Sequence, residues 1–304
     1  MQHSPKSKPT PNPKSAVAPS QFRFDAIGTS WTIDLYQPAP AGLQQKILDR
    51  IAEFDKAYSR FRADSLITTI KQRPGTYQLP ADSLPLFNLY RRLYDLTEGS
   101  MTPLIGSVLE QAGYDAEYSL EPGELHVPPT WDKALRLKGQ TLTTLQSVTI
   151  DVGAAGKGYL LDIIGELLRG AGVTAFCLDA GGDILIQNPN ALTIGLENPD
   201  DLTQVIGVVS ITNGSICGSA GNRRSWAGYQ HIINPHSLVS PTDIKAVWVV
   251  APTGLVADAL TTALYFAKPE LLQEHFAFSY AILSTDGSLR YSANFPAEFF
   301  ETHS

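Results

Sequence analysis

The sequence predicts an α+β fold with largely antiparallel sheets and packed helices. Helical and strand-like segments mix without the regular strand–helix–strand alternation that a parallel sheet requires. Strand candidates are also joined by tight glycine turns, such as Gly181-Gly182-Asp183 and Asp286-Gly287, which are typical of hairpins. Of the 304 residues, 43% are hydrophobic and 17% charged, which is enough apolar side chain for a sizeable core.

The chain begins with a segment of different composition, residues 1–21, which we predict to be a disordered tail rich in Pro, Lys and Ser. It contains almost no large apolar side chain, so it cannot offset the entropy that ordering would cost. Residues 22–304 are predicted to form a single domain. As written, the start shows neither an apolar export signal nor a lipid-anchor cysteine, so we expect a cytoplasmic location.

For the first part of the domain, the sequence predicts strands followed by three helices. Residues Phe22–Tyr36 alternate in the manner of strands around Gly28. The next helix is predicted from apolar residues spaced by four, four, three and four, namely Leu43, Ile47, Ile51, Phe54 and Tyr58. A second helix is expected from Asp82 or Ser83 to Gly99, and a third from Pro103 to Gly113.

The rest of the domain alternates between hairpins and helices. We expect hairpins over Tyr118–Ile150, including a strand at Ser147–Asp151, then a glycine turn at Gly153–Gly158 and a helix over Tyr159–Arg169. The remaining strands are expected at Thr174–Asp179, Ile184–Gln187, Leu192–Glu197, Val205–Thr212, Tyr229–Ile233, Ala246–Ala251, Ser279–Ser284 and Leu289–Ser292. The last helices are expected at Leu255–Phe266 and Pro269–Phe276.

Charge and hydropathy exclude several classes of function. The formal net charge of −7 argues against a broad basic surface for nucleic acid. No apolar run approaches the roughly 18 residues that a transmembrane helix needs. Cys177 and Cys217 both lie in apolar strand-like runs, so we interpret them as core residues and not as a disulfide or metal site.

Two glycine-rich turns are candidates for binding a nucleotide. The turn Gly153–Gly158 exposes backbone N–H groups at the start of a helix and carries Lys157, which suits phosphate, although a purely conformational turn explains it equally well. It does not fit the phosphate-loop signature, because Gly158 occupies the hydroxyl position. At Gly181-Gly182-Asp183 another group could approach the backbone closely, but an ordinary hairpin turn is the simpler interpretation.

Two further positions suggest a metal and a base. Asp258 and Thr262 are four residues apart on an apolar helix, so they share a face and could bind Mg²⁺; the alternative is that Asp258 caps the helix. His231, at the end of a predicted strand, could accept a proton near neutral pH. A hydrogen-bonded structural histidine is the alternative.

Taken in order, these segments resemble the FAD:protein FMN transferases of the ApbE family. The resemblance covers about Phe24 to Asn294. The segments that carry it are Ala26-Ile27-Gly28-Thr29, Tyr58-Ser59-Arg60-Phe61 with Asp64-Ser65, Gly113-Tyr114, Gly156-Lys157-Gly158-Tyr159 with Asp162, Ala180-Gly181-Gly182-Asp183, His231-Ile232-Ile233-Asn234-Pro235 and Ala257-Asp258-Ala259-Leu260-Thr261-Thr262-Ala263. An ApbE-like architecture, related to the T-fold, is therefore expected.

The resemblance implies that the protein cleaves the FAD diphosphate and transfers FMN to a Ser or Thr hydroxyl of an acceptor flavoprotein, releasing AMP. It implies Mg²⁺ held by Asp258, Thr262 and the carbonyl of Gly156, with His231 as the base. The residues that it places at the nucleotide are Thr29, Tyr114, Lys157, Gly158, Asp162, Gly181, Gly182 and Asp183. An FAD pyrophosphatase and a non-catalytic FAD carrier are the alternatives. Many family members are exported, which is the alternative to a cytoplasmic location.

The chain departs from the family pattern at several positions, among them Gly156, which replaces an alanine. Thr102 replaces an aspartate before Pro103, and Asn234 replaces the aspartate after the His-Ile-Ile segment. Ser237 and Leu238 stand where the family has threonine and glycine. These departures leave open a changed specificity or a lost activity.

Overall fold

The structure, a computed structural model, describes residues 20–300. The predicted tail falls mainly on residues 1–19, outside the described residues, so its disorder stays a prediction. Its last two residues, Ser20 and Gln21, belong instead to strand β1. They are ordered because they pair with Leu35 and Asp34 of the neighbouring strand.

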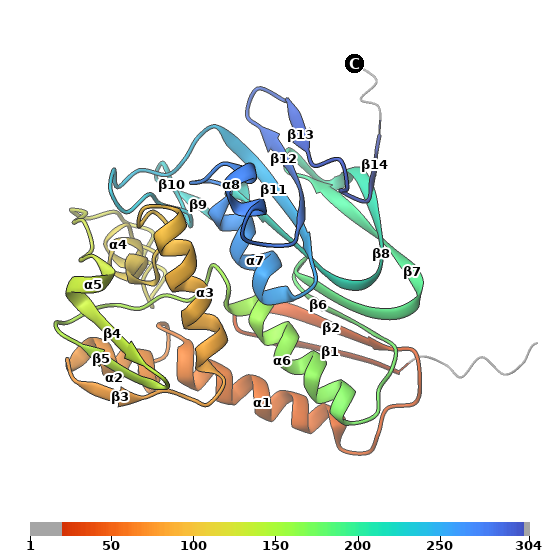
Figure 1. The fold of residues 1–304 in the computed structure, drawn as a ribbon, viewed down its shortest axis with the longest axis horizontal. Coiled ribbons are helices and arrows are strands. Elements are labelled where there is room, and N and C mark those ends of the chain that lie inside the picture. Colours follow the sequence, from red (N-terminus) through yellow and green to blue (C-terminus); the bar gives the residue numbers. More distant parts are fainter. Residues whose placement is uncertain (1–19, 301–304) are drawn as a thin grey trace, which may run out of the picture.

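A nine-stranded sheet forms one side of the molecule (Figure 1). Its strands run in the order β1-β2-β6-β7-β8-β11-β12-β13, with β14 also pairing with β8, and every pair is antiparallel. The strands are β1 (Ser20–Ala26), β2 (Thr29–Leu35), β6 (Phe176–Ala180), β7 (Ile184–Asn198), β8 (Asp201–Ala220), β11 (Ile244–Ala251), β12 (Ser279–Ser284), β13 (Leu289–Tyr291) and β14 (Ala297–Phe299). The predicted α+β class with antiparallel sheets is confirmed.

Helices α6 and α7 lie between this sheet and the other helices (Figure 1). Helix α7 packs on β8 and β11, α6 packs on β6 and β7, and the two helices pack on each other. On their other side, α1 contacts α6 and α3 contacts α7. The helices are α1 (Leu43–Tyr58), α2 (Leu66–Gln72), α3 (Ser83–Leu96), α4 (Gly106–Gln111), α5 (Trp131–Ala134), α6 (Gly156–Gly170), α7 (Gly254–Ala263) and α8 (Pro269–Gln273).

Smaller elements complete the fold. A three-stranded antiparallel sheet is ordered β3-β5-β4, and β9 pairs with β10. These elements are β3 (Thr76–Gln78), β4 (Leu135–Lys138), β5 (Thr141–Thr144), β9 (Ser225–Trp226) and β10 (Tyr229–Gln230), with single 3₁₀ turns η1 (Pro103–Ile105) and η2 (Gly221–Arg224).

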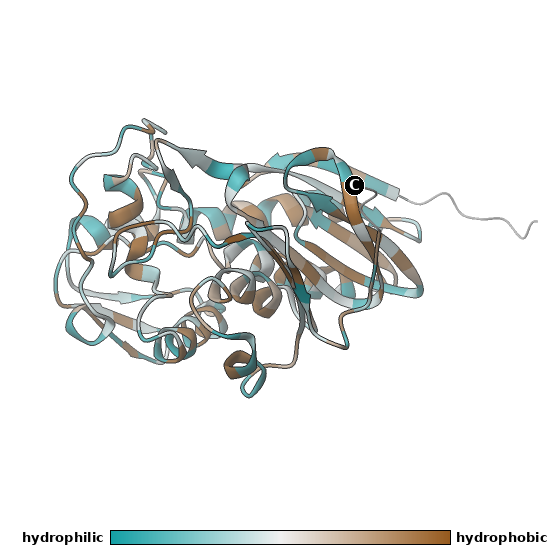
Figure 2. Cartoon of the chain, turned by 90° about the horizontal axis from the view of Figure 1, so that it is seen from above, coloured by the Kyte–Doolittle hydropathy of each residue, from teal (hydrophilic) through white to brown (hydrophobic). Residues whose placement is uncertain are grey.

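The main core lies between the large sheet and the helices. All five apolar residues predicted for the first helix face are buried in it, from Leu43 to Tyr58. In Figure 2 the helices carry brown, hydrophobic faces, and brown and teal residues both occur along the strands of the large sheet. Cys177 and Cys217 are buried and unpaired, as predicted. Within residues 20–300, no helix is long and apolar enough to cross a membrane.

Several predicted elements are wrong in extent. Residues Ser147–Asp151 form no strand, because the backbone N–H of Asp151 bonds to the carbonyl of Pro103 and not to a strand. Of Tyr229–Ile233, only Tyr229–Gln230 pairs as a strand. The two strands predicted on either side of Asn188 join into the single strand β7, with an irregular register against β8 between Gln187 and Leu192.

Other elements were missed or begin elsewhere. Helix α6 starts at Gly156, three residues before the predicted start, so Lys157 lies in its first turn. Helix α2 was not predicted, although Ser65 caps it by accepting a hydrogen bond from the backbone N–H of Thr68. The short elements β3, β14 and α5 carry too little periodic pattern to be predicted.

Candidate active site

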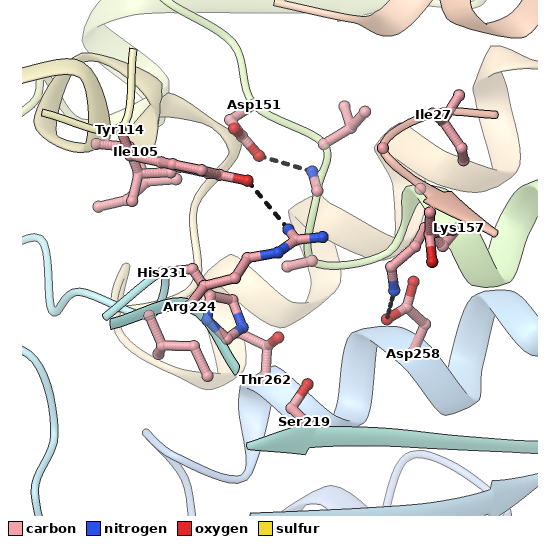
Figure 3. Close-up of a pocket in the computed structure, with 18 of the residues that line it drawn as sticks. Ile27, Ile105, Tyr114, Asp151, Lys157, Ser219, Arg224, His231, Asp258 and Thr262 are labelled. Atoms are coloured by element: carbon pink, nitrogen blue, oxygen red, sulfur yellow. Dashed lines mark hydrogen bonds and ion pairs between the residues drawn. The ribbon is translucent and has the colours of Figure 1, made fainter. Parts of the chain in front are cut away.

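A cavity of about 910 Å³ opens where α6, α7, β8 and the smaller elements meet. This volume lies at the upper end of the range for ligand sites. Of the twelve predicted site residues, nine line it: Thr29, Tyr114, Gly156, Lys157, Gly181, Asp183, His231, Asp258 and Thr262. Gly158, Asp162 and Gly182 do not line it. Figure 3 shows Lys157 and Asp258 facing each other, with Thr262 and His231 nearby.

The three predicted residues outside the lining bond to other parts of the chain. The carboxylate of Asp162 accepts hydrogen bonds from the backbone N–H groups of Gly254 (2.7 Å) and Leu255 (2.8 Å), and so caps the start of α7. Gly158 lies against Gly254, where a Cβ on either residue would overlap the other backbone. The N–H of Gly182 donates to Asp179 Oδ1 (2.8 Å) within its turn. Asp162 and Gly158 therefore hold α6 against α7.

Lys157, Asp183 and Asp258 form a group that we call the charge cluster, in which the two aspartates are buried and Lys157 is half-buried. The ammonium of Lys157 is ion-paired with Asp183 Oδ2 and lies 3.8 Å from Asp258 Oδ1. Burial raises the pKa of Asp258 to about 6, while the Lys157 ammonium acts in the opposite direction. Burial opposes the charge of Lys157, but the carboxylates of Asp183 and Asp258 outweigh it and raise the pKa of the ammonium. Lys157 therefore stays charged.

The residues predicted to hold Mg²⁺ offer oxygen ligands of the kind that this ion prefers. Asp258 supplies a carboxylate, Thr262 a hydroxyl and Gly156 a carbonyl, and all three residues line the cavity. Among residues 20–300, no group of three or more His, Cys, Asp or Glu side chains could hold a metal ion by itself. The set therefore fits an ion that takes few protein ligands and shares its shell with phosphate oxygens and water.

His231 follows β10, and its backbone N–H bonds to the carbonyl of Arg224 (3.2 Å). The Nδ1 atom of its ring is buried and has no hydrogen-bond partner within residues 20–300. Burial lowers the pKa of His231 to about 4, with the positive charges of Arg224 and Lys157 acting in the same direction. The ring is therefore neutral near pH 7, which is the form that can accept a proton.

Arg60, Asp151 and Arg224 also line the cavity, although none of them was among the predicted site residues. The Nε atom of Arg60 donates to Asp151 Oδ2 (2.5 Å), and the Arg60 guanidinium lies 4.1 Å from the ring centroid of Phe61. Arg224 Nη1 donates to the hydroxyl of Tyr114 (3.1 Å; Figure 3). Arg60 and Asp151 are 91 residues apart, so no local spacing indicated this pair.

Comparison with known proteins places this fold and cavity in a family. Residues 27–280 match the sequence profile of the ApbE family. The chain belongs to the ApbE family. The match includes the segments around Lys157, Asp183, His231 and Asp258, so the resemblance recognised in the sequence is confirmed.

Individual relatives extend over most of the chain. It is 22% identical to the FAD:protein FMN transferase of Escherichia coli strain K12, covering 88% of this chain and 84% of that protein. It is 24% identical to the FAD:protein FMN transferase of Treponema pallidum, covering 88% and 85%. The relatives are transferases by name.

Solved structures share the fold. The ApbE protein of Thermotoga maritima superposes with a TM-score of 0.80 at 22% identity, covering 92% of this chain and all of that one. The flavin transferase ApbE of Vibrio cholerae superposes with a TM-score of 0.76 at 19% identity, covering 91% and 98%. The predicted ApbE-like architecture is therefore confirmed.

Two of the residues that differ from the ApbE pattern make backbone hydrogen bonds that an aspartate could also make. The hydroxyl of Thr102 accepts from the N–H of Leu104 (3.2 Å) and caps η1. The amide oxygen of Asn234 accepts from the N–H groups of His236 (2.8 Å) and Ser237 (3.2 Å). Leu238, at the family's glycine position, has a φ of 60°, which glycine adopts more easily.

Proposed function

We propose that this chain is a Mg²⁺-dependent FAD:protein FMN transferase. The observation that carries the proposal is the meeting of His231, Lys157, Asp258 and Thr262 in one cavity, although they come from three separate segments of the chain. The relatives named as FAD:protein FMN transferases support the choice of substrate and reaction. FAD is the substrate, and the partner is an acceptor flavoprotein with an exposed Ser or Thr.

In the proposed reaction, the acceptor hydroxyl loses its proton to His231. The hydroxyl oxygen forms a phosphoester bond with the phosphorus of the FMN half, while the phosphoanhydride bond to AMP breaks and AMP leaves. Such transfer depends mainly on positioning and on stabilising negative charge. A well-placed base contributes about 10²–10⁴-fold. The buried Nδ1 and the lowered pKa keep His231 neutral and able to act in this way.

Positive charge at the diphosphate comes from the chain and from the proposed ion. Mg²⁺, when bound by Asp258, Thr262 and the Gly156 carbonyl, supplies positive charge that stabilises the diphosphate oxygens during transfer. Lys157 adds a permanent ammonium at the same end of the cavity. Both matter because the protein carries a formal net charge of −7 and has to bind an anionic dinucleotide.

The test is to incubate the protein with FAD, Mg²⁺ and an acceptor domain and to measure fluorescent acceptor and free nucleotides. We expect labelled acceptor and one AMP for each FMN transferred. His231→Gln and Asp258→Asn should each lower labelling by about 10²-fold or more. Exposed matched controls, His126→Gln and Asp286→Asn, should label like the unmodified protein.

Other products would contradict the transferase. AMP and free FMN released at the same rate with and without acceptor would indicate an FAD pyrophosphatase. FAD that stays bound and intact in the presence of Mg²⁺ and a competent acceptor would indicate a non-catalytic carrier.

A further inference from the structure

The proposed function assigns a role to Lys157 and Asp258 but leaves Asp183 unexplained. Asp183 lines the cavity, yet it is only 2% exposed. Its carboxylate bonds to Lys157, which lies 26 residues away. Since a buried carboxylate is costly unless it is paired, this contact is the feature to be explained.

The two carboxylate oxygens of Asp258 are not equivalent. Oδ2 accepts a hydrogen bond from the backbone N–H of Gly158 (2.8 Å) at the junction of α6 and α7. Oδ1 faces the Lys157 ammonium at 3.8 Å, which is longer than a hydrogen bond. Oδ1 is therefore the oxygen left for a metal ion, and the ammonium is a cation that competes for it.

Asp183 holds that ammonium more closely than Asp258 does. Its backbone is fixed in the turn between β6 and β7, where its carbonyl accepts from the N–H of Ala180 (2.8 Å). The position of the Lys157 ammonium is thus a balance between two carboxylates, one on a sheet turn and one on α7.

We propose that Asp183 is a positioning residue that draws the Lys157 ammonium away from Asp258 Oδ1 and thereby sets the affinity of that oxygen for a divalent cation. This inference rests on the proposed function, because it takes Asp258 as a metal ligand. The cluster of two carboxylates and one ammonium carries a charge of −1 before the metal binds. Removing the carboxylate of Asp183 should therefore weaken metal binding, whereas removing the ammonium of Lys157 should strengthen it.

Titration with Mn²⁺ alone, followed by electron paramagnetic resonance of the free ion, tests the proposal without measuring activity. In Asp183→Asn the ammonium loses its other carboxylate and closes on Asp258, so the dissociation constant for Mn²⁺ should rise about tenfold. In Lys157→Gln the competing cation is gone, so the dissociation constant should fall at least about threefold. The double variant has no ammonium for Asp183 to position, so it should bind Mn²⁺ about as tightly as Lys157→Gln does.

Controls separate this role from a merely structural one. Asp82→Asn removes a carboxylate that is ion-paired with Arg50 outside the cavity, and should leave the Mn²⁺ affinity unchanged. Thermal unfolding with and without Mn²⁺ shows whether each variant folds and binds. If Asp183→Asn does not fold, Asp183→Ser takes its place in the titration, with the same expected rise in the dissociation constant for Mn²⁺.

The proposal is overturned if Asp183→Asn binds Mn²⁺ as tightly as the unmodified protein, or if Lys157→Gln binds it more weakly. Absence of Mn²⁺ binding to the unmodified protein also overturns it. Acceptor labelling is measured separately. If the acceptor is labelled but the variants do not differ in Mn²⁺ affinity, only the role of Asp183 is contradicted. If the variants show the expected affinities but the acceptor is not labelled, the transferase is contradicted and the cation site remains.

Discussion

The charge cluster and the segments that depart from the ApbE pattern differ in what their side chains supply: charge in the first, hydrogen bonds to the backbone in the second. The charge cluster keeps every charged residue that the family resemblance implies, and its members contact one another across α6, α7 and the β6–β7 turn. At Thr102 and Asn234 the aspartates are gone, but the hydrogen bonds to the backbone remain. A hydroxyl or an amide oxygen can accept such a bond as a carboxylate does, whereas neither can supply a negative charge beside an ammonium or a metal ion.

The largest expected effect concerns the packing that carries the charge cluster. Gly158→Ala places a methyl group into the backbone of Gly254, so it should lower the free energy of unfolding by about 3 kcal/mol or more. Gly170→Ala is the matched control at the other end of α6, where a Cβ meets nothing within 4 Å, and should change stability by less than about 1 kcal/mol. Urea unfolding measures both. Equal effects would show that the α6–α7 contact is not tight.

The next prediction concerns pH and His231. Its pKa is lowered to about 4 in the folded protein from 6.5, so the unfolded chain takes up a proton first as the pH falls. The contribution of the neutral His231 ring to the free energy of unfolding is therefore fully present above pH 6.5. It is lost as the pH falls from 6.5 to about 4, and the loss amounts to roughly 3 kcal/mol.

Unfolding free energies of the unmodified protein and of His231→Gln, compared across this range, check the prediction. The difference between the two should fall as the pH falls. The comparison with His231→Gln is needed because Asp162 and Asp258 act in the opposite sense. Their pKa values are raised to about 6, so their contribution to the stability of the protein falls as the pH rises. A difference that does not change with pH would mean that His231 is not kept neutral by burial.

A smaller effect separates hydrogen bonding from charge at Asn234. Asn234→Asp keeps an acceptor for the N–H groups of His236 and Ser237, and should change acceptor labelling by less than about twofold. Asn234→Leu removes the acceptor and should cost about 1 kcal/mol of stability. Labelling rates and thermal unfolding measure the two. A large gain of labelling in Asn234→Asp would show that the family's charge matters there after all.

The smallest effect is expected at Leu238. Leu238→Gly relieves a left-handed backbone conformation, which costs a leucine about 1 kcal/mol. It also removes a partly buried apolar side chain that packs against the small hydrophobic cluster to which Tyr114, Trp226 and Ile233 belong. The two contributions oppose each other, so the net change in unfolding free energy should stay within about 1 kcal/mol. A clear loss of stability would mean that packing outweighs the strain.

Local patterns predicted most of the secondary structure. The apolar spacing of α1 and the glycine turn between β12 and β13 each depend on neighbours in sequence, and both appear where expected. The Ser147–Asp151 strand was wrong because its strand-like composition has no neighbouring strand with which to pair. Element type follows from local pattern, but strand pairing depends on what lies alongside.

The sequence by itself determined the α+β class, the family, and which residue types the cavity has available for binding and proton transfer. Only the tertiary structure decided what individual carboxylates do. Asp162 and Asp183 both lie in recognisable motifs, yet one caps a helix 92 residues away and the other holds Lys157. The physical reason is that the partner of a buried charge is set by proximity in space, which side chains reach only after distant segments have packed together.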